Sequence, residues 1–185
     1  MDGSVSYLSH DIDPLKDLTS AFGNFCVTGN HEYYSGVEHW IEKFDDLGLI
    51  TLVNEHRLIK RGDGRLLVAG VTDLRGERFN RLHRSDPFKA VDGAPPSDLK
   101  ILLAHQPKSI FGAAEAGFDL QISGHTHGGQ FFPWTCFVFL AQPFDVGLHQ
   151  YQNTKLYVSG GTGYWGPPLR VGSPSEITLI EFVSV

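Results

Sequence analysis

Long apolar runs are missing from this chain. None of its apolar stretches approaches the roughly 18 residues that a membrane-spanning helix needs. Its first residues also lack the basic start and the apolar run that are typical of a secretory signal peptide. These two absences predict that the chain, as given, is soluble.

Basic residues are outnumbered by acidic ones. The 185 residues include 15 Lys and Arg against 21 Asp and Glu, for a formal net charge of -6. A domain that binds nucleic acid usually carries a basic patch. No nucleic-acid partner is therefore expected.

Cysteine is also scarce. Only Cys26 and Cys136 occur, so the chain has no disulfide framework. Both lie among apolar residues, and we expect them to be small buried side chains. Neither adjoins a histidine motif, and no Gly-x-Ser-x-Gly sequence is present. A mechanism based on a serine or cysteine nucleophile therefore has little support.

What the chain does contain is a series of short apolar segments, which predicts one α/β domain over residues 1–185. Apolar residues make up 41% of the chain, enough for a core of its own. Runs rich in β-branched residues predict strands, and apolar residues spaced three or four apart predict helices. The strands are expected at 24–28, 50–53, 57–60, 65–71, 100–104, 118–122, 156–159 and 177–182, and the helices at 6–18, 37–47, within 72–90 and at 108–116.

Three of the predicted strands are followed by imidazole or amide side chains. Asn30 and His31 follow the first strand, His105 follows strand 100–104, and His125 and His127 follow strand 118–122. In an extended backbone, residues 125 and 127 point to the same side. Open α/β sheets bind their ligands at the carboxyl ends of strands, and neutral imidazole is a common metal ligand. These motifs therefore predict a metal site, whereas surface or structural roles are expected for His10, His39, His56, His83 and His149.

The same motifs resemble a known family. Gly29-Asn30-His31-Glu32, His105-Gln106-Pro107 and Gly124-His125-Thr126-His127 are similar, in this order, to the later signature blocks of the calcineurin-like metallophosphoesterases. The stretch from Gly160 to Arg170 resembles the branch that includes transmembrane proteins with a metallophosphoesterase domain. The resemblance implies an α/β fold, a layered metallophosphoesterase-type β-sandwich flanked by helices. It also implies that a longer parent protein could be associated with a membrane.

The resemblance further implies a metal-dependent hydrolase of phosphoric monoesters or diesters. Asn30, His105 and His125 would bind one metal ion, and His127 would bind the other. His31 would stabilise the transition state and protonate the leaving oxygen. Two divalent ions would activate a hydroxide nucleophile, and the mixed nitrogen and oxygen ligands favour manganese, iron or zinc.

Two blocks of the family pattern have no counterpart in the sequence. The family begins with an Asp-x-His block and a Gly-Asp block, and Asp2 matches only an outer position of the latter. The resemblance thus predicts a domain that is incomplete at its N-terminus and lacks the first strand, helix and strand. The alternatives are a non-catalytic fragment that binds one metal or none and a mononuclear zinc hydrolase, the latter disfavoured because the Asn30 amide is a poor zinc ligand.

The substrate is left open by these motifs, and so is the oligomeric state. A nucleotide, a phosphoprotein and a phospholipid-like phosphoester all fit the family chemistry. Residues 131–148 are rich in aromatics and predict either packing over the sheet or an apolar flap that contacts a lipid-like substrate. Four arginines, at 75, 78, 81 and 84, recur every three residues and predict either a solvated helix face or electrostatic steering of a phosphate.

Overall fold

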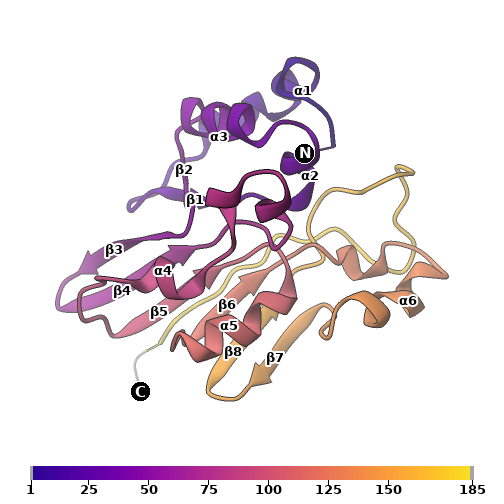
Figure 1. Cartoon of the computed structure of the whole chain (residues 1–185). Coiled ribbons are helices and arrows are strands. Elements are labelled where there is room, and N and C mark those ends of the chain that lie inside the picture. The colour runs from indigo at the N-terminus through magenta and orange to yellow at the C-terminus, as the bar shows by residue number, and fades with distance from the viewer. Residues whose placement is uncertain (1, 184–185) are drawn as a thin grey trace.

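The computed structural model describes residues 2–183, apart from the side chains at positions 139 and 141, and it confirms an α/β fold (Figure 1). A six-stranded sheet has the order β3-β4-β5-β6-β8-β7, and β1 and β2 form a separate parallel pair. The strands are β1 Asn24–Cys26, β2 Leu49–Thr51, β3 Glu55–Arg61, β4 Gly64–Gly70, β5 Leu99–Leu103, β6 Leu120–Ser123, β7 Gly147–Tyr151 and β8 Thr154–Val158. The helices are α1 Val5–Ile12, α2 Asn30–Tyr34, α3 Val37–Asp46, α4 Pro87–Val91, α5 Ile110–Glu115 and α6 Trp134–Ala141.

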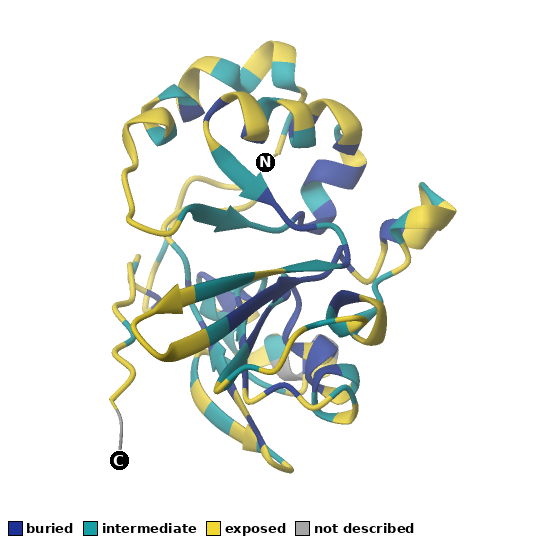
Figure 2. Cartoon of the chain, turned by 90° about the vertical axis from the view of Figure 1, so that its left-hand side faces the viewer, coloured by how far each residue is buried: buried dark blue, intermediate teal, exposed yellow. Residues whose placement is uncertain are grey.

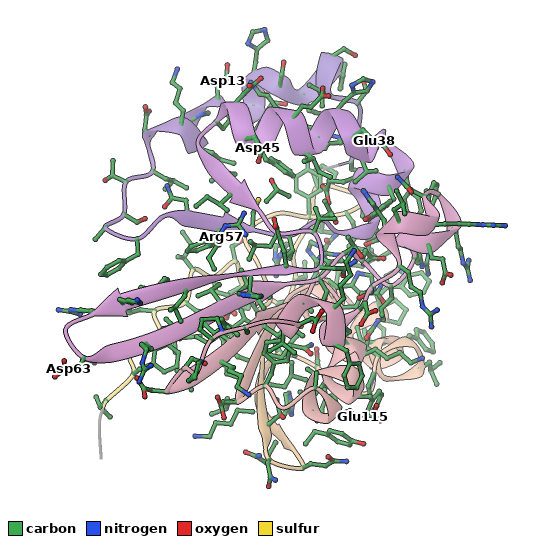
Figure 3. All side chains as sticks on the ribbon, turned by 60° about the vertical axis from the view of Figure 1, so that its left-hand side comes forward. Asp13, Glu38, Asp45, Arg57, Asp63 and Glu115 are labelled. Carbon is green, nitrogen blue, oxygen red and sulfur yellow. The ribbon has the colours of Figure 1, made fainter. Side chains whose placement is uncertain are left out.

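The large sheet is mixed. Its inner strands β4, β5, β6 and β8 run parallel, and its edge strands β3 and β7 pair antiparallel with their neighbours. The β3–β4 hairpin confirms the predicted turn at Gly62-Asp63-Gly64, and Asp63 lies at its exposed tip (Figure 3). Because the inner strands are parallel, their carboxyl ends lie along one edge of the sheet.

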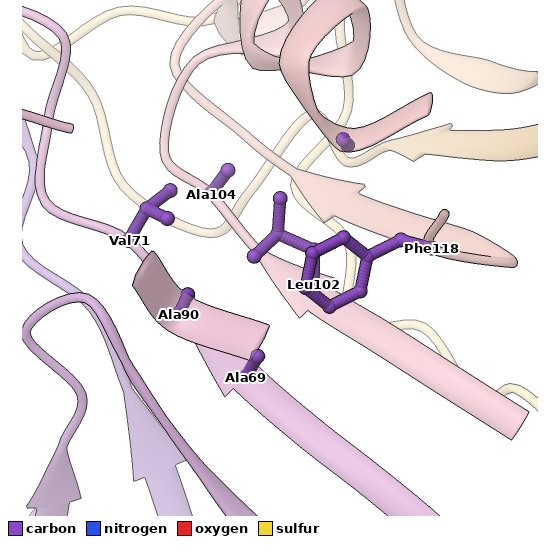
Figure 4. Packing of buried hydrophobic residues seen from close by; sticks show 7 residues of the cluster. Ala69, Val71, Ala90, Leu102, Ala104 and Phe118 are labelled. Atoms are coloured by element: carbon purple, nitrogen blue, oxygen red, sulfur yellow. The ribbon is translucent and has the colours of Figure 1, made fainter. Parts of the chain in front are cut away.

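The main core lies between this sheet and the helices α4 and α5. It consists of Ala69, Val71, Ala90, Leu102, Ala104, Ala113 and Phe118 (Figure 4). Ala90 and Ala113 are the small residues that α4 and α5 contribute, and they let both helices approach the strands closely. Phe118 fills the remaining space and is 2% exposed.

A second layer covers β1 and β2 with α1 and α3, whose outer faces are exposed (Figure 2). The apolar residues predicted for one face of α3 include Trp40 and Phe44, and both are buried. The Trp40 indole N–H donates to the carbonyl of Gly3 at 3.0 Å, which ties the start of the chain to this layer. Gly48 follows the end of α3 and has a φ of +80°, in the left-handed conformation that glycine tolerates best.

Several expectations from the sequence were wrong. The predicted helix 6–18 stops at Ile12 and continues as a 3-10 turn from Asp13, because Pro14 lacks the N–H that a longer helix would use. The helix expected within 72–90 is present as the short α4, and two 3-10 turns, Gly76–Arg78 and Arg81–His83, precede it. Strand β7 was not predicted, and it pairs with β8 along Gly147–Tyr151.

The predicted strand 177–182 is not formed. A strand requires the backbone of a neighbouring strand. Among the described residues, the last backbone hydrogen bond of this region is the one that the Glu176 N–H donates to the Gly161 carbonyl. The predicted burial of Cys136 was also wrong, since this cysteine is exposed on α6, while Cys26 is half-buried.

Within residues 2–183, none of the helices combines the length and apolar character that crossing a bilayer requires.

Candidate functional site

The loops after β1, β5 and β6 bring the predicted site residues together. The His105 Nε2 atom lies 3.0 Å from Asn30 Oδ1 and 3.1 Å from His125 Nδ1. The backbone ties two of these loops to each other, because the Gly124 N–H donates to the His105 carbonyl at 3.1 Å. Three potential donor atoms from distant parts of the sequence therefore meet at one point.

The backbone of the His125–His127 motif is not extended. His125 and His127 have φ values of +71° and +51°, in the left-handed region that non-glycine residues seldom adopt. The expectation of an extended His-Thr-His segment was therefore wrong, although both imidazoles still line the same cavity. Backbone strain of this kind is typical of functional loops that the surrounding structure holds in place.

Burial keeps the two central imidazoles neutral. It lowers the pKa of His105 to about 3, with the nearby His125 adding to the effect. Burial also lowers the pKa of His125 to about 4, and the Arg75 cation contributes next. Both rings are therefore uncharged near pH 7, which is the form that binds metal ions.

His127 lies in the same cavity and is held through its backbone. Burial and the Arg170 cation lower the pKa of its imidazole. Its carbonyl accepts a hydrogen bond from Ser173 Oγ at 2.6 Å and from Arg170 Nη2 at 3.3 Å. Its ring Nδ1 atom is buried and has no hydrogen-bond partner within the described part of the chain. A buried nitrogen without a hydrogen-bond partner lowers the stability of the fold unless a ligand binds to it.

His31 lies on α2 and contacts the carboxylate of Asp2. The two are joined by a contact of 2.9 Å between His31 Nδ1 and Asp2 Oδ1. The imidazole also packs edge-on against the ring of Tyr34, with centroids 5.7 Å apart. These two neighbours fix the orientation of the ring, whose other nitrogen is Nε2.

Asn30, His105 and His125 could together hold one metal ion. Among residues 2–183, no three histidine, cysteine, aspartate or glutamate side chains are grouped closely enough to hold a metal ion. The third donor beside His105 and His125 is thus the Asn30 amide oxygen. Two ligand atoms of one tetrahedral or octahedral ion are about 3.0–3.4 Å apart, which agrees with the separations of 3.0 and 3.1 Å found here. His127 is left as the one described histidine for a second ion.

The histidines form one side of a cavity of about 450 Å³. Motif-based reasoning missed much of its lining. The remaining lining residues include Arg75, Val138, Gln142 and Trp165. Arg75 belongs to the predicted arginine series, but no helix forms there, and it is the one member of that series that lines the cavity.

A buried polar network supports the cavity. Both Asp73 carboxylate oxygens accept hydrogen bonds from Gln106 Nε2, at 3.0 and 2.9 Å. Gln106 Oε1 in turn accepts from Gln142 Nε2 at 3.1 Å. Burial raises the pKa of Asp73, while the Arg75 backbone N–H opposes this change. The network joins the loop of Arg75, the loop of His105 and the end of α6. The histidine motifs at the strand ends do not predict this network.

A search of protein-family models matches residues 2–129 to the calcineurin-like phosphoesterase model. The chain is 38% identical to a zebrafish (Danio rerio) transmembrane protein with metallophosphoesterase domain, over 97% of this chain and 43% of that protein. It is 40% identical to an uncharacterized metallophosphoesterase of Helicobacter pylori, over 99% of this chain and 49% of that protein. The chain thus spans about half the length of these curated relatives.

Two solved structures share the fold at low sequence identity. The sulfate thiohydrolase SoxB of Thermus thermophilus superposes with a TM-score of 0.57 at 16% identity, over 86% of this chain and 32% of that chain. A putative 5'-nucleotidase of Staphylococcus aureus superposes with a TM-score of 0.54 at 15% identity, over 96% of this chain and 43% of that chain. At these identities the likeness shows the fold alone.

Proposed function

Because this chain belongs to the calcineurin-like phosphoesterase family, we propose that the cavity beside His105 is a site for metal-dependent hydrolysis of phosphoric esters. The observation that carries this proposal is the convergence of Asn30 Oδ1, His105 Nε2 and His125 Nδ1 within 3.0–3.1 Å contacts. Neutral imidazoles at such spacing are well suited to binding a divalent cation.

Asn30, His105 and His125 would hold one divalent ion, and His127 would contribute to a second. Manganese, iron or zinc suits these nitrogen and oxygen donors. When bound, such an ion supplies Lewis acidity toward phosphate oxygens and lowers the pKa of bound water. The buried, unpartnered Nδ1 of His127 supports its inclusion in the donor set.

His31 is the candidate for proton transfer to the leaving oxygen. It lines the cavity, and its Nδ1 is engaged by Asp2 at 2.9 Å. Nε2 is therefore the ring nitrogen available to the substrate, and Asp2 is a positioning residue that orients it.

A second candidate function is non-catalytic binding of a single metal ion. It is favoured by the lining of the cavity, in which the described residues include no carboxylate. A bridging carboxylate would offset the repulsion between two dications at close range. Whether the site binds one ion or two therefore separates the two candidates.

The relatives extend well beyond the part that this chain matches, so the activity of a whole protein containing it is also a proposal. Some relatives are named as transmembrane proteins. We propose on that basis that such a whole protein is associated with a membrane and acts on small phosphoesters or phospholipid-like ones.

The proposed function is tested by metal stoichiometry together with hydrolysis of bis(p-nitrophenyl) phosphate. The chain is loaded with manganese or zinc, dialysed and analysed for metal. We expect bound metal and measurable hydrolysis, both lost in His125→Ala and both retained in His10→Ala, a substitution of an exposed histidine on α1. Bound metal without hydrolysis would favour the non-catalytic alternative, and metal binding unaffected by His125→Ala would exclude the proposed site.

A further inference from the structure

One side of the cavity is apolar. Val138 from α6 and Trp165 from the loop after β8 line it together with the histidines. The indole of Trp165 contacts that of Trp134 at a centroid separation of 6.3 Å, and Trp134 contacts the ring of Phe137 at 5.9 Å. Val138 and Trp165 thus line the cavity, and Trp134 and Phe137 adjoin them on α6 and through these ring contacts. We call Trp134, Phe137, Val138 and Trp165 the apolar wall.

The loop that carries the histidine motif fixes Trp165 in the wall. Gln130, which is fully buried, accepts a hydrogen bond from the Trp165 N–H at 2.8 Å and donates one to the Trp165 carbonyl at 2.9 Å. It follows the His127–Gly129 turn directly. A buried amide that makes both bonds to one residue holds that residue tightly, so the position of Trp165 is coupled to that of His127.

Both ends of α6 are likewise attached to the histidine loops. Gly129 packs against the first turn so closely that a Cβ there would lie 2.3 Å from the Thr135 Cα. At the other end, Gln142 accepts a hydrogen bond from the Lys108 N–H at 3.3 Å and donates to Gln106. Gln106 is the neighbour of His105. Helix α6, which carries three of the four residues of the apolar wall, is therefore held in place by the loops of His105 and His127.

Arg75 supplies a positive charge to the same cavity. Its backbone N–H donates to Asp73 Oδ1 at 2.8 Å, and its guanidinium is hydrogen-bonded to the Tyr34 hydroxyl. None of the ion pairs found among the described residues involves Arg75. An anchored guanidinium that makes no close ion pair is well suited to binding a phosphate group.

From this arrangement we propose that the cavity binds phosphoesters that carry an apolar chain, with the phosphate between Arg75 and the histidines and the chain along the apolar wall. The inference rests on the proposed function and names its substrate class. A volume of about 450 Å³ accommodates a phosphate and a short chain. Trp134 and Phe137 are half-exposed and extend the wall for longer chains.

The test is calorimetric titration of the manganese-loaded chain with inorganic phosphate and with ethyl, butyl, hexyl and octyl phosphate, each below its micelle concentration. A fully buried methylene tightens binding about fourfold, and the wall covers only one side of the chain. We therefore expect the affinity to rise at least about tenfold from ethyl to octyl phosphate.

Three variants separate the parts of the site. Val138→Asp should abolish the dependence on chain length while phosphate still binds. Arg75→Gln should weaken every ligand by a similar factor, about tenfold, and leave the chain-length dependence intact. Leu140→Asp is the matched control, because Leu140 lies on the same helix but is 83% exposed. Circular dichroism spectra that match the unmodified chain establish that each variant is folded.

The outcomes distinguish failure of this inference from failure of the proposed function. Binding of phosphate with no gain from longer chains would overturn the inference and leave the proposed function standing. A chain-length effect that Leu140→Asp removes and Val138→Asp does not would also overturn it. No binding of phosphate, or binding that His125→Ala leaves unchanged, would contradict the proposed function itself.

Discussion

Gly29 is in direct contact with the His105 imidazole. A Cβ at this position would lie 2.8 Å from His105 Cε1 and 2.9 Å from both ring nitrogens. The backbone of Gly29, with φ -102° and ψ 179°, is one that any residue adopts. The absence of a side chain is therefore required for the position of His105 and not for the backbone.

We expect Gly29→Ala to displace the His105 ring and weaken metal binding at least about tenfold, since ligand geometry is strict. Competitive titration with a chelating dye measures the effect. Gly163→Ala is the control, because a Cβ at Gly163 meets nothing within 4 Å. Equal metal affinity in both variants would show that His105 does not bind the ion.

Gln106 follows His105 in the sequence, and its side-chain amide donates hydrogen bonds to a buried carboxylate. Both oxygens of Asp73, which is 1% exposed, accept from its amide. Loss of these bonds leaves the carboxylate with fewer partners in a buried site, which costs about 1–3 kcal/mol or more. The network therefore stabilises the folded chain and also supports the cavity.

Gln106→Leu should accordingly lower the free energy of unfolding by about 2–4 kcal/mol. Urea denaturation followed by circular dichroism measures this change. Combining it with Asp73→Asn should recover part of the loss, because the neutral amide no longer carries a buried charge. If the two substitutions destabilise the chain additively, the two residues do not interact in the way described here.

At the scale of elements, the sequence predicted the site better where the backbone is regular than where it turns. Short apolar runs predicted His105 and His125 at the carboxyl ends of strands, and β5 and β6 prove to be parallel neighbours. The left-handed backbone of His125 and His127 has no such signal, because residue type alone does not specify it. The role of Arg75 was ambiguous for a related reason: it depends on Tyr34, which is distant in the sequence but adjacent in space.

The failure of strand 177–182 has a different cause. Its composition favours a strand, but strand formation needs a partner strand, and the hydrogen bonds that hold this segment near β8 are made largely by side chains. Glu176 Oε1 accepts from the Gly160 N–H and the Tyr157 hydroxyl, each at 3.0 Å. The Thr178 hydroxyl also contacts that of Tyr157 at 2.8 Å. This segment is thus attached near the end of β8 through the Glu176 carboxylate and the Thr178 hydroxyl, together with the Glu176 N–H.

These bonds give the attachment a defined pH dependence. The Gly160 N–H, followed by neighbouring hydroxyl groups, lowers the pKa of Glu176. A carboxyl group with a lowered pKa contributes stability that is fully present above the ordinary glutamate pKa and is lost as the pH falls through the lowered value. The attachment should therefore weaken below about pH 4.3.

We expect the amide proton resonance of Gly160 to move upfield with a midpoint below about pH 4.3, as its carboxylate acceptor is protonated. Nuclear magnetic resonance spectra recorded over a pH series measure this shift. In Glu176→Gln the resonance should not follow such a titration. A Gly160 resonance that titrates equally in both proteins would mean that another group is responsible.

At the scale of the whole molecule, the segment after Glu176 exposes apolar side chains almost completely. Ile177 and Leu179 are 92% and 93% exposed, and they alternate with the polar Thr178. A β-prone apolar segment with no neighbouring strand is a template for pairing with another chain. The edge strands β3 and β7 offer unpaired backbone groups of the same kind. We therefore expect association between copies of this chain to begin at residues 177–179.

The double substitution Ile177→Thr and Leu179→Lys should raise the concentration at which the chain aggregates on warming, with little change in its melting temperature. Neither side chain packs in a core, so their replacement removes no burial, while a lysine on an exposed strand-like segment opposes pairing. Light scattering and calorimetry measure the two quantities separately. Leu82→Lys is the control for added charge, since Leu82 is 80% exposed in the 3-10 turn Arg81–His83. If Leu82→Lys delays aggregation as much as the double substitution, net charge decides solubility and the 177–179 segment has no special role.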